Sequence, residues 1–215
     1  MDRRRQEGEA TPPQERPEEI VRRGYDRAAE RYAAARDQLK NERHLRLFTR
    51  FLPPPAEVLD IGCGSGRPID ASLIELGYTV AGIDNSARQI ELARRLVPRA
   101  HFEVRDMLDL AEGEYRVDGI VAFYAIFHIP RDRHAALLGT LRSFLRPGGV
   151  LLATMGGGMW EGSEPDFHGV EMYWSHFDPP TNRTLVEAAG FSIELDEMES
   201  ETPGERHQVI LARKA

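Results

Sequence analysis

Short apolar runs alternate with amphipathic segments along most of the chain. The apolar runs are bounded by glycine, proline or acidic residues and predict strands, at residues 57–61, 79–83, 101–104, 117–123 and 150–154. Between them, apolar positions recur at three- and four-residue spacing and predict helices, at residues 68–76, 86–96 and 131–145. Strands that alternate with helices of this length imply right-handed crossovers. We therefore predict an α/β fold with a mostly parallel sheet.

The two ends of the chain depart from this alternation. Residues 1–18 contain almost no apolar side chain and predict a disordered tail. Residues 19–52 contain two amphipathic stretches, the second capped by Asn41, and predict an N-terminal helical cap. A predicted helix over residues 181–189 is followed by strands at 191–195 and 208–212, which are joined by a loop alone and so form an antiparallel pair at the sheet edge. Residues 53–215 then make one domain.

Composition disfavours several classes of protein. The net charge of −7 disfavours a nucleic-acid partner, because phosphate contacts need clustered Lys and Arg. No apolar run approaches the roughly 20 residues that cross a bilayer, and the N-terminus lacks the apolar stretch of a signal peptide, so we expect a cytoplasmic protein without a membrane partner. The single cysteine, Cys63, excludes a disulfide within the chain. The histidines show no paired ligand spacing, so we predict no metal site.

A glycine loop follows the first predicted strand. Gly62, Gly64 and Gly66 have the spacing G-x-G-x-G, whereas a dinucleotide-binding loop has the spacing G-x-G-x-x-G. Arg67 stands where the third glycine of that loop belongs. Asp60 precedes the loop, where a carboxylate would repel a pyrophosphate and favour a cationic ligand. The loop is therefore either a binding loop for such a ligand or an ordinary strand-to-helix turn, and NAD-dependent oxidation is disfavoured.

Acidic residues stand at the ends of three successive strands. Asp60 ends the first, Asp84 the second, and Asp106 follows the third. Ligands in open α/β sheets bind at this edge, where an acid like Asp84 can accept both hydroxyls of a ribose. Asp106 can accept from an adenine amine while Met107 packs on the ring. Each acid alone would more often be a helix cap or a solvated loop residue, but the three together describe a cavity for a cation, a ribose and an adenine.

These residues resemble the class I S-adenosylmethionine-dependent methyltransferases that act on small molecules. The resemblance covers residues 20–213, in order: the first motif at 58–66, the two acids at Asp84 and Asp106, the fourth strand at 118–123, the turn and fifth strand at 145–152, and the start of the sixth strand at 188–191. It implies a three-layer Rossmann-like fold whose seven-stranded, mostly parallel sheet has the order 3-2-1-4-5-7-6, with the seventh strand antiparallel.

The resemblance also implies a cofactor, S-adenosylmethionine, which leaves as S-adenosylhomocysteine. Asp60 would support the loop and the methionine amine, and Tyr25 would form a lid over the cofactor. The residues expected to bind the cofactor are Tyr25, Asp60, Gly62, Gly64, Gly66, Asp84, Asn85, Asp106, Met107 and Phe123.

The substrate is expected near the ends of the fourth and fifth strands. Nucleic-acid amino-methyltransferases carry Asn/Asp-Pro-Pro-Tyr/Phe there, which residues 122–125 lack. His128 is a candidate general base, or equally a histidine that caps a helix or binds backbone. Residues 156–178 have no clear period and predict a substrate-lid insert, opposite the helix that carries Tyr25. The residues expected at the substrate are Tyr124, Phe127, Trp160, His168, Tyr173, Trp174 and His176; in the insert, aromatic side chains are also common as packing.

The sequence therefore predicts an enzyme that transfers the methyl group of S-adenosylmethionine to O, N or C of a small metabolite, which is apolar or aromatic if the insert lines its pocket. The alternative is a protein that binds the cofactor structurally or uses it in cyclisation or decarboxylation. In-line alignment alone supplies about 7–11 kcal/mol of such a barrier, so a catalytic base is not obligatory. The sequence leaves a monomer and a homodimer equally open.

Overall fold

The computed structural model describes residues 15–36, 42–200 and 206–215. Most of the predicted tail and the predicted cap Asn41 lie outside the described residues. Two helices, α1 (Pro17–Arg36) and α2 (Glu42–Phe51), lie where the helical cap was predicted. α1 begins within the last two residues of the range predicted for the tail. A proline suits this position because the first helical turn leaves its amide hydrogens unpaired.

A seven-stranded sheet of order β3-β2-β1-β4-β5-β9-β8 forms the centre of the structure. Its strands are β1 (Glu57–Ile61), β2 (Thr79–Asp84), β3 (His101–Val104), β4 (Val117–Ala122), β5 (Leu145–Gly156), β8 (Phe191–Glu199) and β9 (His207–Lys214). β1 to β5 pair in parallel, whereas β9 is antiparallel to both β5 and β8. Counted within the sheet, this is the order 3-2-1-4-5-7-6, so the predicted fold class is confirmed.

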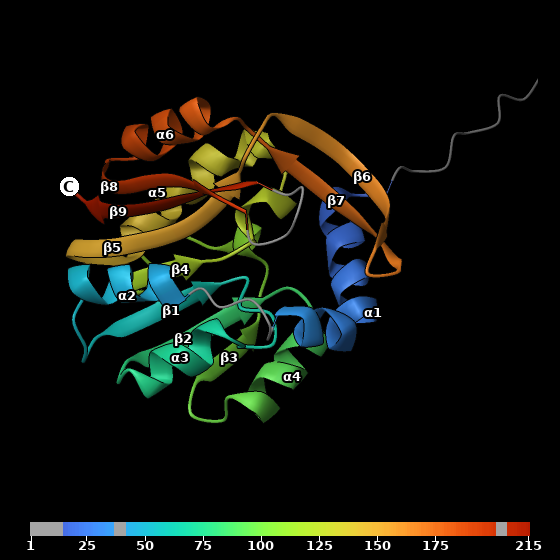
Figure 1. Ribbon diagram of the computed structural model, residues 1–215, viewed down its shortest axis with the longest axis horizontal. Coiled ribbons are helices and arrows are strands. Elements are labelled where there is room, and N and C mark those ends of the chain that lie inside the picture. The colour runs from blue at the N-terminus through green and yellow to red at the C-terminus, as the bar shows by residue number, and fades with distance from the viewer. Residues whose placement is uncertain (1–14, 37–41, 201–205) are drawn as a thin grey trace, which may run out of the picture.

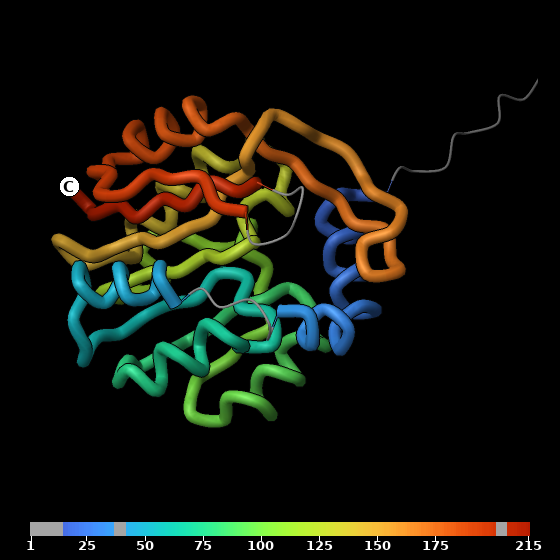
Figure 2. The backbone as a smooth tube through the Cα atoms, viewed as in Figure 1, coloured from blue at the N-terminus to red at the C-terminus, as the bar shows by residue number. Residues whose placement is uncertain are grey.

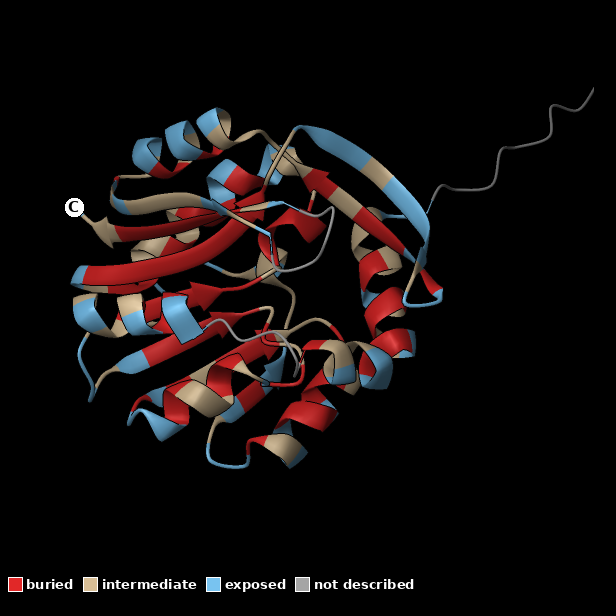
Figure 3. Ribbon diagram, viewed as in Figure 1, coloured by how far each residue is buried: buried red, intermediate tan, exposed pale blue. Residues whose placement is uncertain are grey.

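Helices cover both faces of the sheet (Figure 1). α5 (His134–Phe144) and α6 (Pro179–Ala188) pack on one face, and α2, α3 (Ile69–Glu75) and α4 (Ala87–Leu96) on the other. Side chains of successive residues in a strand point to opposite faces, so Leu59 joins the first core and Val58 the second. Figure 3 shows the buried residues concentrated in the sheet. Three short 3-10 turns connect these elements: η1 (Met107–Asp109), η2 (Ile126–His128) and η3 (Arg131–Arg133).

The insert differs from its prediction, because it folds as a β-hairpin. β6 (Trp160–Phe167) and β7 (Val170–His176) form a separate two-stranded sheet. Nearly every residue of β6 is exposed, and β7 is buried on both faces, so neither strand shows the apolar–polar alternation that identifies a half-buried strand.

α1 and the hairpin pack side by side, although they lie far apart in the sequence (Figure 2). Their shared core contains Val21, Tyr25 and Ala28 of α1 and Val170 and Met172 of β7. The approach is closest at Gly24, where a Cβ would lie 2.8 Å from Cε of Met172 and 2.9 Å from the carbonyl oxygen of Glu171. α1 and the hairpin therefore form one unit, called the cover below, rather than two opposing walls.

A membrane-spanning helix needs about 20 mostly apolar residues, which sets a standard for the helices of the described residues. None of them is long and apolar enough to cross a membrane.

Candidate functional site

The glycine loop after β1 lies against the ends of β2 and β4. The amides of Gly62 and Cys63 donate to the carbonyl of Ile83, at 2.8 and 3.0 Å. Gly62 has a φ of +72°, and a Cβ there would lie 2.5 Å from the Cβ of Ala125. Gly64 also has a positive φ, +54°, but its missing Cβ would point into open space, with only the Gln89 side chain within 4 Å. The loop thus needs glycine at both positions, and space is left above Gly64.

Asp84 anchors this loop at the end of β2. Its Oδ2 accepts from the Gly64 amide at 2.9 Å, and its Oδ1 accepts from the Ser86 amide at 2.8 Å. Burial raises the pKa of Asp84 to about 6, although the two backbone donors oppose that rise. A carboxylate oxygen has two lone pairs, so each oxygen can accept one further hydrogen bond from a ligand.

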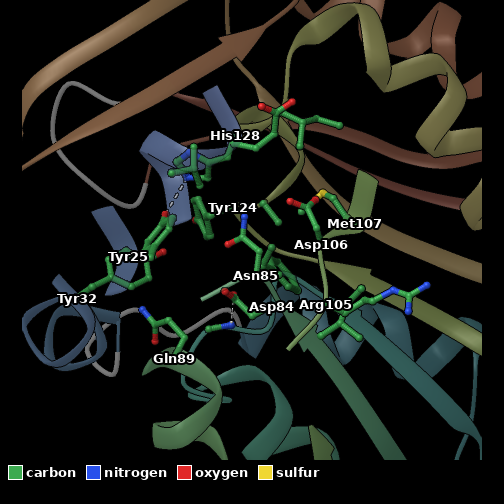
Figure 4. Close-up of a pocket in the computed structure, with 18 residues that line it drawn as sticks. Tyr25, Tyr32, Asp84, Asn85, Gln89, Arg105, Asp106, Met107, Tyr124 and His128 are labelled. Carbon is green, nitrogen blue, oxygen red and sulfur yellow. Dashed lines mark hydrogen bonds between the residues drawn. The ribbon is translucent and has the colours of Figure 1, made fainter. Parts of the chain in front are cut away.

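A cavity of about 610 Å³, part of it open to solvent, lies over this loop. Its lining includes most of the residues predicted to bind the cofactor: Tyr25, Gly62, Gly64, Asp84, Asn85, Asp106, Met107 and Phe123, with Tyr124 and His128 from the predicted substrate side (Figure 4). Asp60 and Gly66 are not in the lining. Asp60 is buried and Asp70 of α3 packs beneath the loop, where a Cβ on Gly66 would lie 3.4 Å from Oδ2 of Asp70. Asp60 is thus outside the cavity lining, and its predicted role toward the loop and the methionine amine stays a prediction.

Gln89 is a cavity residue that the sequence analysis missed. It is fully buried, and neither its amide oxygen nor its amide nitrogen has a hydrogen-bond partner. In a capping box, the side chain of the third helical residue returns to the backbone amide of the N-cap, here Ser86. Asp84 already accepts from that amide, so the Gln89 side chain faces the cavity instead. The Ser86-x-x-Gln89 spacing beside an acidic strand end is the signal that could have found it.

His128 of η2 joins the base of the cavity to the cover. Its Nδ1 lies 2.9 Å from the carbonyl oxygen of Tyr173, which only accepts, so Nδ1 carries the hydrogen. Its Nε2 then accepts from the hydroxyl of Tyr25 at 2.7 Å. Burial lowers the pKa of His128 to about 4 and raises the pKa of Tyr25, so both groups are neutral at pH 7. The histidine thus combines the backbone-binding role with a position at the cavity.

The part of the chain that carries the glycine loop and the strand-end acids is similar to known proteins. Residues 58–149 match the model of a family described as a methyltransferase domain. The predicted resemblance to methyltransferases is therefore confirmed for this segment. The matched residues include the glycine loop, Asp84, Asp106 and His128.

Curated relatives and a solved structure extend the comparison. A trans-aconitate 2-methyltransferase of Variovorax paradoxus is 35% identical over 48% of this chain and 40% of its own length. An O-methyltransferase of Penicillium expansum is 30% identical over 67% of this chain and 55% of its own length, so the chain spans about half of these relatives. The 1,6-didemethyltoxoflavin-N1-methyltransferase of Burkholderia thailandensis has the same fold, with a TM-score of 0.74, 23% identity and coverage of 96% of this chain and 93% of that chain.

The remaining residues predicted at the substrate do not line the cavity. The Trp174 ring packs on His128 at a centroid distance of 4.4 Å and on Phe127 at 5.6 Å. Tyr173 contributes its carbonyl to His128 and donates its hydroxyl to Glu161. The other three belong to the hairpin: His168 lies at its tip against Tyr32, His176 lies at its base, and Trp160 is 39% exposed.

Tyr124 has a strained backbone at the end of β4. Its φ is +56°, a region that non-glycine residues rarely adopt. Its hydroxyl donates to Oε1 of Glu199 at 3.0 Å, and the guanidinium of Arg36 lies 4.4 Å from the ring centroid. Strain of this kind is concentrated at functional sites, where the surrounding contacts hold it in place. Tyr124 thus fixes the end of the cavity that lies nearest to β8 and β9.

A protein metal site needs several His, Cys, Asp or Glu side chains close together. Within the part of the chain that the structure describes, no group of three or more His, Cys, Asp or Glu residues could hold a metal ion.

Proposed function

We propose that this chain transfers the methyl group of S-adenosylmethionine to a small molecule in the cytoplasm, and that it acts on neither nucleic acid nor membrane. The observation that carries the proposal is the acidic cavity over the glycine loop of a methyltransferase domain, in which Asp84 and Asp106 stand at successive strand ends. The curated relatives include an O-methyltransferase and a trans-aconitate 2-methyltransferase, so hydroxyl and carboxylate oxygens are the first acceptors to test.

The residues present fit this cofactor. Asp84 offers two acceptor positions to ribose hydroxyls, and the space over Gly64 admits a ligand close to the backbone. Asp106, whose Oδ1 is fixed by the Leu108 amide at 2.9 Å, would accept from the adenine amine, with Met107 packed on the ring. The unpartnered amide of Gln89 would serve a polar group of the ribose or the methionine part. When bound, the cofactor supplies an electrophilic methyl group on a sulfonium.

Transfer of that methyl group is an in-line displacement, so the first task of the protein is alignment. Holding the reactants in attack geometry contributes about 7–11 kcal/mol to such reactions. Tyr25, His128 and Tyr124 face the cavity from three different elements and would hold the acceptor there. The cover would exclude water from the site, which strengthens every electrostatic contact inside it.

His128 can take a proton from the acceptor only through Tyr25, because the Tyr25 hydroxyl occupies Nε2. In that relay, the acceptor gives its proton to the Tyr25 oxygen while the Tyr25 proton moves to Nε2. The low pKa of His128 keeps Nε2 unprotonated at any pH well above about 4, but it also makes the resulting imidazolium costly. We therefore assign His128 chiefly to holding Tyr25, with proton transfer as a secondary role.

Formation of S-adenosylhomocysteine tests this proposal. The chain is incubated with S-adenosylmethionine and a panel of hydroxy and carboxylic acids and phenols, with the Asp84→Ala variant as a matched control. Acceptor-dependent S-adenosylhomocysteine from the wild type alone supports methyl transfer. Tight cofactor binding without S-adenosylhomocysteine from any acceptor, including amines and carbon nucleophiles, would favour the non-methylating alternative. Binding of NAD in place of S-adenosylhomocysteine would overturn both.

A further inference from the structure

Two cavities share one wall in the first turn of α1. Among the described residues, Glu18 and Asp106 alone line both the cavity over the glycine loop and an outer, polar cavity of about 730 Å³ that is partly open to solvent. Glu18 belongs to α1 of the cover, whereas Asp106 belongs to the segment that follows β3 of the central sheet. These two carboxylates therefore stand at the same boundary, between the inner cavity and the outside, and approach it from different parts of the fold.

The Glu18 carboxylate has an unmet hydrogen bond. Its Oε2 is buried and has no partner. The two arginines closest in sequence donate to other acids, because Arg16 donates to Glu19 at 2.7 Å and Arg22 lies 3.6 Å from Asp26. The charge of Arg16 still acts on both Glu18 and Asp106, but it supplies no hydrogen bond to Glu18 Oε2. A buried carboxylate oxygen without a donor is costly, and a second carboxylate at the same wall raises that cost. Such an arrangement is relieved by a ligand that brings hydrogen-bond donors to both acids.

From this wall we infer that Glu18 and Asp106 together bind the exocyclic amine of the adenine of the cofactor. The inference rests on the proposed function, which places a purine beside Asp106 and Met107. An exocyclic amine carries two hydrogens, so it can donate one to the carboxylate of the cover and one to the carboxylate after β3. Val21 and Ile129, which line the same cavity, provide apolar surface for the ring. The bound purine then links α1 to the sheet.

Replacing the amine by a carbonyl oxygen separates this role from a general effect on the cover. S-Inosylhomocysteine has this change, which also places a hydrogen on N1 of the ring, and keeps the ribose and the amino acid of S-adenosylhomocysteine. Its carbonyl oxygen would face two acceptors, so the wild type should bind it at least tenfold more weakly than S-adenosylhomocysteine.

The experiment is calorimetric titration of both ligands into the full chain and into Glu18→Gln, Glu18→Ala and the control Glu19→Gln. Glu19 lies in the same turn but lines only the outer cavity. We expect Glu18→Ala to weaken S-adenosylhomocysteine roughly tenfold or more, and Glu18→Gln to weaken it less because its amide oxygen still accepts. Both variants should weaken S-inosylhomocysteine less than about threefold and should melt no lower than the wild type. Glu19→Gln should bind both ligands as the wild type does.

Two results would overturn the inference. Equal weakening of both ligands would make Glu18 a residue that only positions α1, and unchanged S-adenosylhomocysteine affinity would remove it from the site. Either result leaves the proposed function standing, provided that the wild type binds S-adenosylhomocysteine. A wild type that binds neither ligand would overturn the proposed function itself.

Discussion

The floor of the cavity comprises residues 62–64, 84–85 and 106–107, and Asp60 and Gly66 lie beneath it. In the floor, backbone amides hold the functional side chains. Asp84 accepts from two amides and Asp106 from one. In the cover, side chains hold side chains or loops: Tyr25 donates to His128, and the Arg31 guanidinium donates to the carbonyl of His168. Backbone contacts follow from the strand and loop geometry itself. The side-chain contacts of the cover depend on the identity of each residue, so each contact can be removed by a single substitution.

The largest effect expected from breaking the floor is that of Gly64→Val. A β-branched residue adopts a φ of +54° only with strain, and its methyl groups would fill the space over the loop. We expect S-adenosylhomocysteine binding to fall below detection in calorimetry. Gly158→Val is the matched control, because a Cβ there meets nothing within 4 Å. Normal binding by a folded Gly64→Val protein would show that the loop assignment is wrong.

Asp84→Ala should have the next largest effect. Each hydrogen bond to a charged acceptor contributes about 1.5–3 kcal/mol, so loss of two ribose contacts should weaken S-adenosylhomocysteine by roughly two decades or more. The variant also releases the amides of Gly64 and Ser86, so its melting temperature must be measured beside its affinity. A folded variant with wild-type affinity would remove Asp84 from the site.

The cover is tested by comparing its two tryptophans. Trp174 packs between His128, Phe127 and Phe167, whereas Trp160 is 39% exposed. We expect Trp174→Ala to lower the free energy of unfolding by about 2–3 kcal/mol and to lower kcat, because His128 loses its support. Trp160→Ala should change stability by less than about 0.5 kcal/mol. If the two variants lost the same free energy of unfolding in urea denaturation, this placement would be wrong. If both raised the KM for the substrate equally, both tryptophans would belong to a substrate lid.

The smallest effect concerns the pH dependence of the acids beneath the floor. Asp60 and Asp70 are both buried and interact with each other, and Asp60 Oδ1 and both oxygens of Asp70 lack any donor. A proton shared between the two carboxyl groups would supply the missing donor. Burial raises the pKa of Asp70 well above its ordinary value and that of Asp60 to about 7. The pKa values of both acids are higher in the folded protein than in the unfolded chain. The protonated pair therefore stabilises the folded protein fully below the unfolded pKa, near 4, and this stabilisation is lost as pH rises through the folded pKa.

Asp70→Asn removes this dependence, because the amide donates to Asp60 without needing a proton. Its melting temperature should exceed that of the wild type at pH 8, and the difference should shrink toward pH 5. Histidines buried in a neutral state act in the opposite direction: burial lowers the pKa of His128 to about 4, so the stability it confers is lost as pH falls from about 6.5 through 4. A difference between Asp70→Asn and wild type that is the same at both pH values would contradict the shared proton.

The floor could be predicted from the sequence because its residues follow patterns that span only a few neighbouring positions. Glycine spacing and an acid at the end of each strand predict Asp84 and Asp106 at one site, and both line the cavity. Gln89 could not be predicted at the cavity, because the direction of its side chain depends on whether Asp84 or Gln89 accepts from the Ser86 amide. The role of each floor residue toward a ligand stays a prediction.

The cover was predicted far less completely. Helix α1 and the lid tyrosine had a periodic signal, but the hairpin had none, since β6 is exposed and β7 is buried on both faces. His128 had two equal interpretations in the sequence, and the structure shows that its ring binds the Tyr173 carbonyl through one nitrogen and the Tyr25 hydroxyl through the other. Its role as a base stays a prediction. Pairings of this kind join residues that lie 103 and 45 positions apart, which no local pattern encodes.

A crystal structure of the chain with S-adenosylhomocysteine tests the central claim most directly. The account predicts that both ribose hydroxyls lie within hydrogen-bond distance of Asp84, that the adenine amine lies on Asp106, and that the sulfur faces Tyr25 and His128 beneath the cover. A ligand whose ribose is not on Asp84, or whose sulfur points away from the cover, would contradict it.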